Sequence, residues 1–163
     1  MLLIRELTKG DYPSVQAIYQ QGIAGGDATF ETRVKPWEEW DAATARAARL
    51  VAVDRDRVVA WACLSDVTSR CVYSGVAETS VYVEQGSQGR GIGTQLLAAL
   101  IEASEKAGYW TLLARIFPEN QSSIAVHRKL GFVDMGTHRK LGKLRDKWRD
   151  VQLLERRSEV AGA

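Results

Sequence analysis

The stretch from Val76 to Leu100 runs from a strand through a glycine-rich turn into a helix, and this order limits the folds open to the chain. Residues 76–84 are mainly valine, threonine and tyrosine with small or polar residues between them, which is typical of a strand. Four glycines then occur within the eight positions 86–93. From position 92 onward, apolar residues recur at helical spacing, which predicts an amphipathic helix directly after the turn.

This arrangement is typical of an anion-binding site. The first N–H groups of a helix have no partner within it, and the helix dipole adds partial positive charge there. Glycines let that backbone approach a phosphate closely. The segment Gly91-Ile92-Gly93-Thr94 lacks the lysine of a P-loop, and the third glycine of a dinucleotide fingerprint is missing. Two interpretations stay open: a site for a phosphorylated ligand, or a plain connection between strand and helix.

Length and composition predict one domain over residues 1–163 with a sizeable core. The 22 basic and 20 acidic residues leave a formal charge of +2, which is too close to neutral to indicate nucleic-acid binding. No apolar run approaches the roughly 18 residues of a membrane span, and no signal peptide is visible. The cysteines, Cys63 and Cys71, form no CxxC or Cys/His cluster. We therefore expect a cytoplasmic protein without a metal site and without nucleic-acid or membrane partners.

The remaining patterns predict a mixed α/β (α+β) chain. Strands are expected over residues 2–6, 50–53, 57–64, 76–84, 110–116, 132–135 and 151–154. Helices are expected from Thr8 or Asp11 to the glycines at 22–26, from Pro36 to near Arg49, from 92 to 107 and from 118 to 130. The basic stretch 138–149 reads as a connection, and the tail from Arg156 as frayed. This order predicts a partly antiparallel sheet flanked by helices.

Further motifs accompany the glycine-rich turn. Asn120, Ser123 and His127 precede Gly131-Phe132 at fixed spacing, and residues 77–83 read AETSVYV. The turn itself carries Gln88, Gly91 and Gly93 in the order QxxGxG. Smaller matches are Ala28-Thr29-Phe30-Glu31, Arg70-x-x-Tyr73, Gly142 and Trp148-x-Asp150. Over residues 2–155, this set resembles the GNAT superfamily of N-acetyltransferases, and within it the phosphinothricin and methionine sulfoximine N-acetyltransferase branch.

The resemblance implies a GNAT fold, with a mixed, mostly antiparallel V-shaped sheet that splits between its fourth and fifth strands. Acetyl-CoA is the implied co-substrate and lies in the split, and no metal is implied. The fourth strand is expected to carry a bulge and to bind the pantetheine arm through the backbone of residues 81–83. In relatives of this kind the active site lies near the interface of a homodimer. The residues implied to bind acetyl-CoA are Val81, Tyr82, Val83, Gln88, Gly89, Arg90, Gly91, Ile92, Gly93, Thr94, Asn120 and Ser123.

The implied chemistry is direct attack of an amine on the thioester, so no protein nucleophile is needed. Glu78 is the candidate base, because a carboxylate in a partly dry cleft has a raised pKa. The backbone N–H of Val81 is the candidate donor to the oxyanion. His127 is the candidate acid for the departing thiolate. The alternatives are a solvated strand glutamate for Glu78, an ordinary helix histidine for His127 and a simple helix cap for Asn120.

Substrate binding is assigned by the resemblance to Phe30, Glu31, Arg70 and Tyr73. Arg70 is expected to pair with a carboxylate and Glu31 with an ammonium group, whereas the alternatives are a solvated arginine and a core phenylalanine. The stretch Ser69-Arg70-Cys71-Val72-Tyr73 departs from the fuller RxRxAY pattern of many relatives, which affects the choice of substrate. Arg128 and Lys129 are expected either to meet CoA phosphates or to form a solvated basic face.

We therefore expect an N-acetyltransferase that moves an acetyl group from acetyl-CoA to the α-amine of a small amino acid or analogue of the phosphinothricin or methionine sulfoximine type. One alternative is an acetyltransferase for another amine, such as a polyamine or a protein N-terminus. Another is a non-catalytic acyl-CoA sensor, which would not need Glu78. A nucleotide-binding module is a third, and it fits poorly because the turn lacks the lysine or third glycine.

Overall fold

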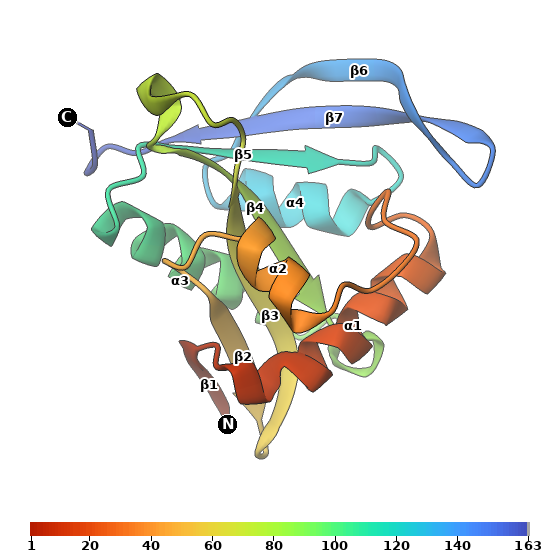
Figure 1. Cartoon of the computed structure of the whole chain (residues 1–163), viewed down its shortest axis with the longest axis vertical. Helices are drawn as coiled ribbons and strands as arrows, with labels where there is room; N and C mark the ends of the chain where they lie inside the picture. Colours follow the sequence, from red (N-terminus) through yellow and green to blue (C-terminus); the bar gives the residue numbers. More distant parts are fainter. Residues whose placement is uncertain (163) are drawn as a thin grey trace.

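The computed structural model describes residues 1–162 and contains a seven-stranded sheet with helices packed against both faces (Figure 1). The order of the strands across the sheet is β1-β2-β3-β4-β5-β7-β6. The strands are β1 (Leu2–Glu6), β2 (Leu50–Asp54), β3 (Arg57–Asp66), β4 (Val76–Val83), β5 (Thr111–Ile116), β6 (Val133–Leu144) and β7 (Lys147–Arg157). The α-helices are α1 (Tyr12–Gly25), α2 (Trp37–Ala43), α3 (Ile92–Lys106) and α4 (Gln121–Lys129), and short 3-10 turns cover Lys9–Asp11, Cys71–Tyr73 and Gln85–Ser87.

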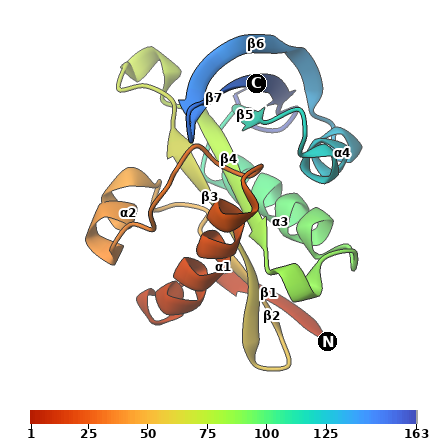
Figure 2. The ribbon, with the colours of Figure 1, turned by 90° about the vertical axis from the view of Figure 1, so that its right-hand side faces the viewer.

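The sheet divides between β4 and β5. All other neighbouring strands pair antiparallel, whereas β4 and β5 run parallel and pair only where residues 76–78 face residues 111–113. Beyond Glu78 the two strands diverge, and β5, β7 and β6 curve away from β4 (Figure 2). This confirms the predicted mixed, mostly antiparallel V-shaped sheet.

The predicted bulge in the fourth strand is wrong. Residues 77–83 of β4 pair with residues 60–66 of β3 in one unbroken register. The outer edge of β4 becomes free because β5 turns away from it, and no extra residue in β4 is needed to expose that edge.

The two faces of the sheet carry separate cores, as strand alternation requires. One core contains Leu96, Leu97 and Leu100 of α3 against alanines of β2 and β3. The opposite core is aromatic, and Trp61 of β3 meets Trp40 of α2 there. None of the helices within residues 1–162 is both long and apolar enough to cross a membrane.

Two predictions of element boundaries are wrong: the carboxy-terminal end of helix α2, and the extent of the last two strands, β6 and β7. Helix α2 ends at Ala43, because Thr44 is extended and its hydroxyl bonds the carbonyl of Trp40. The basic stretch 138–149 is not a connection but most of the β6–β7 hairpin. Apart from Arg149, its charged side chains are exposed, so they carry no apolar alternation from which a strand is predicted.

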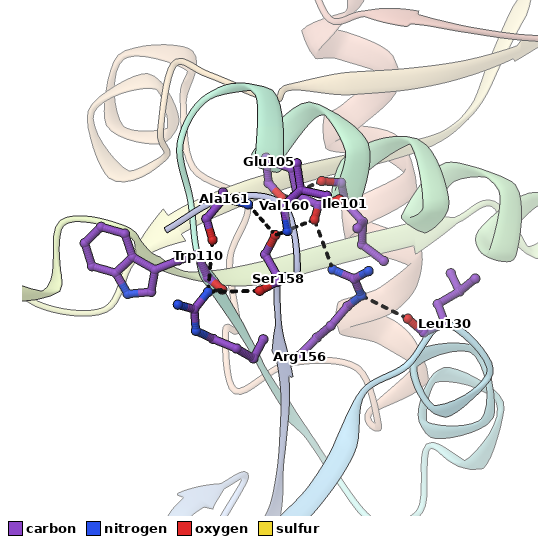
Figure 3. A network of polar contacts seen from close by, with 10 residues as sticks. Ile101, Glu105, Trp110, Leu130, Arg156, Ser158, Val160 and Ala161 are labelled. Atoms are coloured by element: carbon purple, nitrogen blue, oxygen red, sulfur yellow. Dashed lines mark hydrogen bonds and ion pairs between the residues drawn. The ribbon is translucent and has the colours of Figure 1, made fainter. Parts of the chain in front are cut away.

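The prediction of a frayed tail is also wrong. Strand β7 continues to Arg157, and Ser158 is buried. The Ser158 hydroxyl bonds Glu105 of α3 and accepts the N–H groups of Val160 and Ala161 (Figure 3). The backbone N–H of Ser158 donates to the carbonyl of Trp110, 2.8 Å away, so this tail is fastened to the end of the sheet.

Candidate functional site

A cleft of about 1070 Å³ opens where β4 and β5 diverge. Its lining comes from α1, the loop after α1, β4, the glycine-rich turn, β5 and α4, with one residue each from β6 and β7. The edge of residues 79–83 that faces away from β3 has no strand partner, because β5 pairs only as far as Glu78. Those backbone groups therefore remain available to an elongated ligand.

The three β4 residues predicted to bind acetyl-CoA all line this cleft. The ring of Tyr82 stacks on Trp61 with the ring centroids 4.8 Å apart, and its hydroxyl donates to the carbonyl of Ala28. These contacts hold the Tyr82 side chain on the α1 side of the sheet. Val81 and Val83 pack against the opposite core.

The glycine-rich turn delivers the amino-terminal end of α3 to the cleft. Gly89 and Gly91 have φ values of 79° and 77°, a left-handed conformation that glycine adopts without strain. Gly91 is the N-cap of α3, so the first free N–H groups of this helix begin beside the cleft. Of the predicted phosphate-binding residues, Gln88, Gly89, Gly91, Ile92, Gly93 and Thr94 line it.

Arg90 differs from its neighbours in the turn. It does not belong to the lining of the cleft, and its guanidinium bonds the carboxylate of Asp54 at 2.9 Å. Its side chain therefore ties the turn to β2.

Glu78 lies at the fork of the sheet and meets a cation there. Its Oε1 is 3.1 Å from Nη1 of Arg115, which is two residues beyond the last β5 residue paired with β4. The exposed fractions of the two side chains are 28% and 45%. Burial raises the pKa of Glu78 above its usual value of 4.5, and Arg115 opposes that rise. This environment is that of a partly desolvated carboxylate, which suits a general base.

Arg115 was not among the residues predicted for the site. The signal for it is a single arginine inside the apolar strand Thr111–Ile116, at the one position of that strand that is exposed rather than buried or half-buried. A charged residue in such a strand indicates either that this side of the strand faces solvent or that the residue binds a ligand.

His127 of α4 is buried on the side of this helix that faces β4. Its Nδ1 lies 2.8 Å from the carbonyl oxygen of Ser123, and its Nε2 lies 3.1 Å from the hydroxyl of Thr79. A carbonyl only accepts, so Nδ1 carries the proton of the neutral ring and Nε2 accepts from Thr79. Burial lowers the pKa of His127 below its usual 6.5, against the effect of the Ser123 hydrogen bond. The neutral ring therefore has no free N–H for a ligand.

Asn120 and Ser123 also line the cleft. The cap interpretation of Asn120 is confirmed, because its side-chain oxygen accepts the N–H of Ser123 at 3.3 Å. Within residues 1–162, its side-chain amide nitrogen donates no hydrogen bond to the protein.

The predicted substrate-binding residues divide into two groups. Phe30 and Glu31 line the cleft, together with Lys35, whose Nζ is 3.6 Å from Glu31. Arg70 and Tyr73 lie on the turn before β4, outside the lining, with the Arg70 guanidinium 5.5 Å from the tyrosine ring.

Arg149 fastens the loop that carries Phe30. It is buried, and its guanidinium bonds the carbonyl of Gly26 at 2.8 Å and the carboxylate of Asp27 at 2.7 Å. It also stacks 4.1 Å from the ring centre of Phe117, which packs edge-to-face on Phe30. This anchor was not predicted, since its hydrogen-bond partners Gly26 and Asp27 lie more than a hundred residues away in the sequence.

Two basic residues of α4 lie outside the cleft lining. Arg128 pairs with Asp134 at 2.7 Å, and Lys129 follows it on the same helix. Within residues 1–162, no group of three or more histidine, cysteine or acidic side chains is arranged to hold a metal ion.

The chain is similar in sequence to known acetyltransferases. A family model described as the acetyltransferase (GNAT) family matches residues 4–132. Over 158 residues the chain is 32% identical to the L-methionine sulfoximine/L-methionine sulfone acetyltransferase of Pseudomonas paraeruginosa, with 93% of this chain and 92% of that protein covered.

Solved structures agree with this similarity. A GNAT superfamily phosphinothricin acetyltransferase from Sinorhizobium meliloti, in complex with AcCoA, has a TM-score of 0.89 at 28% identity, covering 99% of this chain and 90% of that one. A ribosomal-protein-alanine N-acetyltransferase from Brucella melitensis has a TM-score of 0.88 at 30% identity, covering 96% and 99%.

Proposed function

The chain belongs to the acetyltransferase (GNAT) family, and from this premise we propose that it moves the acetyl group of acetyl-CoA to the α-amine of a small amino acid or analogue. The observation that carries the proposal is one cleft that joins the amino-terminal end of α3 to the partly buried Glu78. The similarity to an enzyme named for methionine sulfoximine and methionine sulfone supports this substrate class.

The cleft suits acetyl-CoA as the acetyl donor. The N–H groups at the start of α3 suit its pyrophosphate, and the free edge of residues 79–83 suits the amides of its pantetheine arm. Glu78 borders that edge, so the thioester would lie within reach of this carboxylate. The solved relative with bound AcCoA supports the same donor here.

Glu78 takes the proton that the substrate ammonium must lose before it attacks the thioester carbonyl. The N–H of Val81 donates to the oxyanion that forms on this carbon. When the tetrahedral intermediate collapses, the carbon–sulfur bond breaks and the thiolate leaves with the electron pair. The nitrogen of the intermediate loses a second proton, which passes to the departing thiolate through water, so that the amine becomes a neutral amide and the thiol is released. The first proton rests on Glu78 until water removes it.

His127 stays a prediction as the proton donor to the thiolate, and its geometry argues against that role. Both ring nitrogens are occupied by Ser123 and Thr79, and the lowered pKa leaves the ring neutral near pH 7. A positioning role agrees better with these contacts: His127 holds Thr79 and the start of α4 beside the cleft.

Phe30 and Glu31 fit the amine end of the cleft, where Phe30 supplies an apolar wall. For Arg70 and Tyr73, contact with a substrate in this cleft requires a movement of their turn or a second subunit. We propose a homodimer, which the exposed large apolar side chains of β6 and β7 support; these are Val133, Met135, Leu141 and Trp148. A single domain, a cytoplasmic location and the absence of nucleic-acid and membrane partners stay predictions from composition.

A second candidate substrate is a protein N-terminus, because a ribosomal-protein-alanine N-acetyltransferase is among the similar structures. The deciding assay measures thiol released from acetyl-CoA with methionine sulfoximine, methionine sulfone, phosphinothricin, the common L-amino acids, spermidine and an alanine-led peptide. We expect the largest kcat/KM with a free amino acid or analogue. A clear preference for spermidine or for the peptide would overturn the proposed substrate class.

A further inference from the structure

The cleft contains few charged side chains. Two cations with fixed charge, Lys35 and Arg115, occur among its described lining residues. Lys35 faces Glu31 on the loop after α1. The other cation, Arg115, contacts Glu78, the proposed base.

The contact between Arg115 and Glu78 leaves most of the guanidinium free. One hydrogen bond joins the two side chains within the described chain, from Nη1 to Oε1 at 3.1 Å. A guanidinium has five N–H donors, and nearly half of the Arg115 side chain is exposed to the cleft and solvent. The second nitrogen, Nη2, and its neighbours are consequently available to a planar anion.

An α-amino acid carries an ammonium and a carboxylate on the same carbon atom. A carboxylate and a guanidinium in contact present the complementary pair of charges at a similar separation. Arginine binds carboxylates through two parallel hydrogen bonds, which also fixes their orientation. We propose that Arg115 binds the α-carboxylate of the amino-acid substrate while Glu78 receives its ammonium, so that this pair selects α-amino acids. The inference rests on the proposed function.

The position of the pair fits this role. Arg115 lies on β5 and Glu78 on β4, where the two strands diverge, so a small molecule bound to both side chains lies in the opening of the sheet. Arg70, which the sequence favoured for the carboxylate, lies outside the cleft lining of this chain. Arg115 needs no second subunit to reach the substrate.

Carboxylate binding by Arg115 also affects the base. In the free protein Arg115 is the group that stabilises the charged form of Glu78. When the guanidinium turns to the substrate carboxylate, the Glu78 oxygen is released to accept from the ammonium. Binding and proton transfer are thereby coupled through one side chain.

The test compares L-methionine sulfone with its carboxamide, which keeps the amine and loses the negative charge. For Arg115→Gln we expect KM for the acid to rise by about 30-fold or more, within the range for lost hydrogen bonds to charged groups. KM for the carboxamide should change by less than about threefold on the same scale. Arg115→Lys should recover part of the preference, since it restores the charge without the planar fork.

Arg57→Gln is the matched control, because Arg57 forms a similar 3.1 Å pair with Glu84 outside the cleft lining. It should leave both KM values unchanged. Circular dichroism and calorimetric binding of acetyl-CoA verify that each variant is folded and loaded.

The inference is overturned if Arg115→Gln keeps the wild-type ratio of the two KM values, or if Arg70→Gln abolishes that ratio and Arg115→Gln does not. Wild-type protein that acetylates acid and carboxamide equally well also overturns it, while leaving acetyl transfer intact. Wild-type protein that releases no thiol with any amine would instead remove the proposed function and, with it, this inference.

Discussion

The Nε2 atom of His127 and the hydroxyl oxygen of Thr79 lie 3.1 Å apart and join α4 to β4 beside the cleft. The other ring nitrogen bonds Ser123, and the ring packs edge-to-face on Phe132. The histidine, which also lines the cleft, is therefore held at both ring nitrogens and against one aromatic ring. Its contacts explain its burial as a structural link between two elements that border the site.

Replacing His127 by asparagine is expected to lower kcat by less than about tenfold, below the usual contribution of a general acid. The asparagine amide can still bond the Ser123 carbonyl, while the contact with Thr79 is lost. The measurement is kcat at several pH values. A fall of about 100-fold or more with an intact fold, or a wild-type kcat that declines above the pKa of His127, would restore it as the acid.

Replacing Glu78 by glutamine is expected to lower kcat by about 100-fold or more, with acetyl-CoA binding retained. Because the base must be deprotonated, wild-type activity falls as the pH drops through the raised pKa of Glu78, above 4.5. The residual activity of the variant should not show this fall at acidic pH, because glutamine does not titrate. Glu84→Gln, outside the cleft lining, is the control and should keep both the rate and the fall at acidic pH. Unchanged turnover in Glu78→Gln would remove Glu78 from the mechanism.

The same residue gives an expectation for stability. A carboxyl group whose pKa is raised in the folded state stabilises the fold below its unfolded pKa, and this contribution is lost as the pH rises through the folded pKa. Charged Glu78 therefore costs stability at neutral pH, and its partner Arg115 is exposed enough to be hydrated without it. We expect Glu78→Gln to melt at the wild-type temperature or above at pH 7, and at acid pH this advantage should shrink.

Arg149→Met is expected to raise KM for the amine more than KM for acetyl-CoA. The change removes the bonds to Gly26 and Asp27 that hold the loop carrying Phe30, while the distant glycine-rich turn keeps its own contacts. Steady-state kinetics with each substrate varied separately provide the measurement. Arg139→Met, at an exposed position of the same hairpin, is the control. Equal changes in both KM values would contradict a role confined to the loop.

The elements that were predicted correctly are those specified by residues that are neighbours in the sequence. The turn between β4 and α3 is specified by four glycines within residues 86–93, and the strand that carries Glu78 follows from its own valine, threonine and tyrosine residues, while the role of Glu78 as the base stays a prediction. Arg115 and Arg149 escaped prediction because their meaning depends on partners brought close by the sheet, such as Asp27 for Arg149.

The longest stretch that was predicted wrongly is the β6–β7 hairpin, and it too depends on contacts between residues that are distant in the sequence. In the hairpin of residues 133–157, β6 is mostly exposed and pairs with β7 alone, and the register between these two strands shifts twice. Exposed charged strands with such shifts lose the period of two on which prediction relies. The ends of this hairpin can therefore be assigned only from the folded structure, in which β7 pairs with β5 and β6 pairs with β7.

Gly75 and Trp110 lie directly before the segment over which β4 and β5 pair, and substituting the glycine is expected to destabilise the protein. The Gly75 carbonyl accepts the N–H groups of Trp110 and Thr111, just before β4 and β5 pair. A Cβ atom at Gly75 would lie 2.1 Å from the Trp110 ring, so Gly75→Ala forces the indole or the backbone to move. We expect a loss of about 1–3 kcal/mol in the free energy of unfolding, the usual cost of overpacking.

A double-mutant cycle separates the clash from a purely conformational need for glycine. Gly75→Ala, Trp110→Leu and the double variant are unfolded in urea, and their free energies of unfolding are compared. Because leucine has no ring at the position of the clash, adding Gly75→Ala to Trp110→Leu should cost much less than adding it to the wild type. An equal cost in both backgrounds would mean that the indole does not explain the glycine, and that the junction of β4 and β5 depends on its backbone alone.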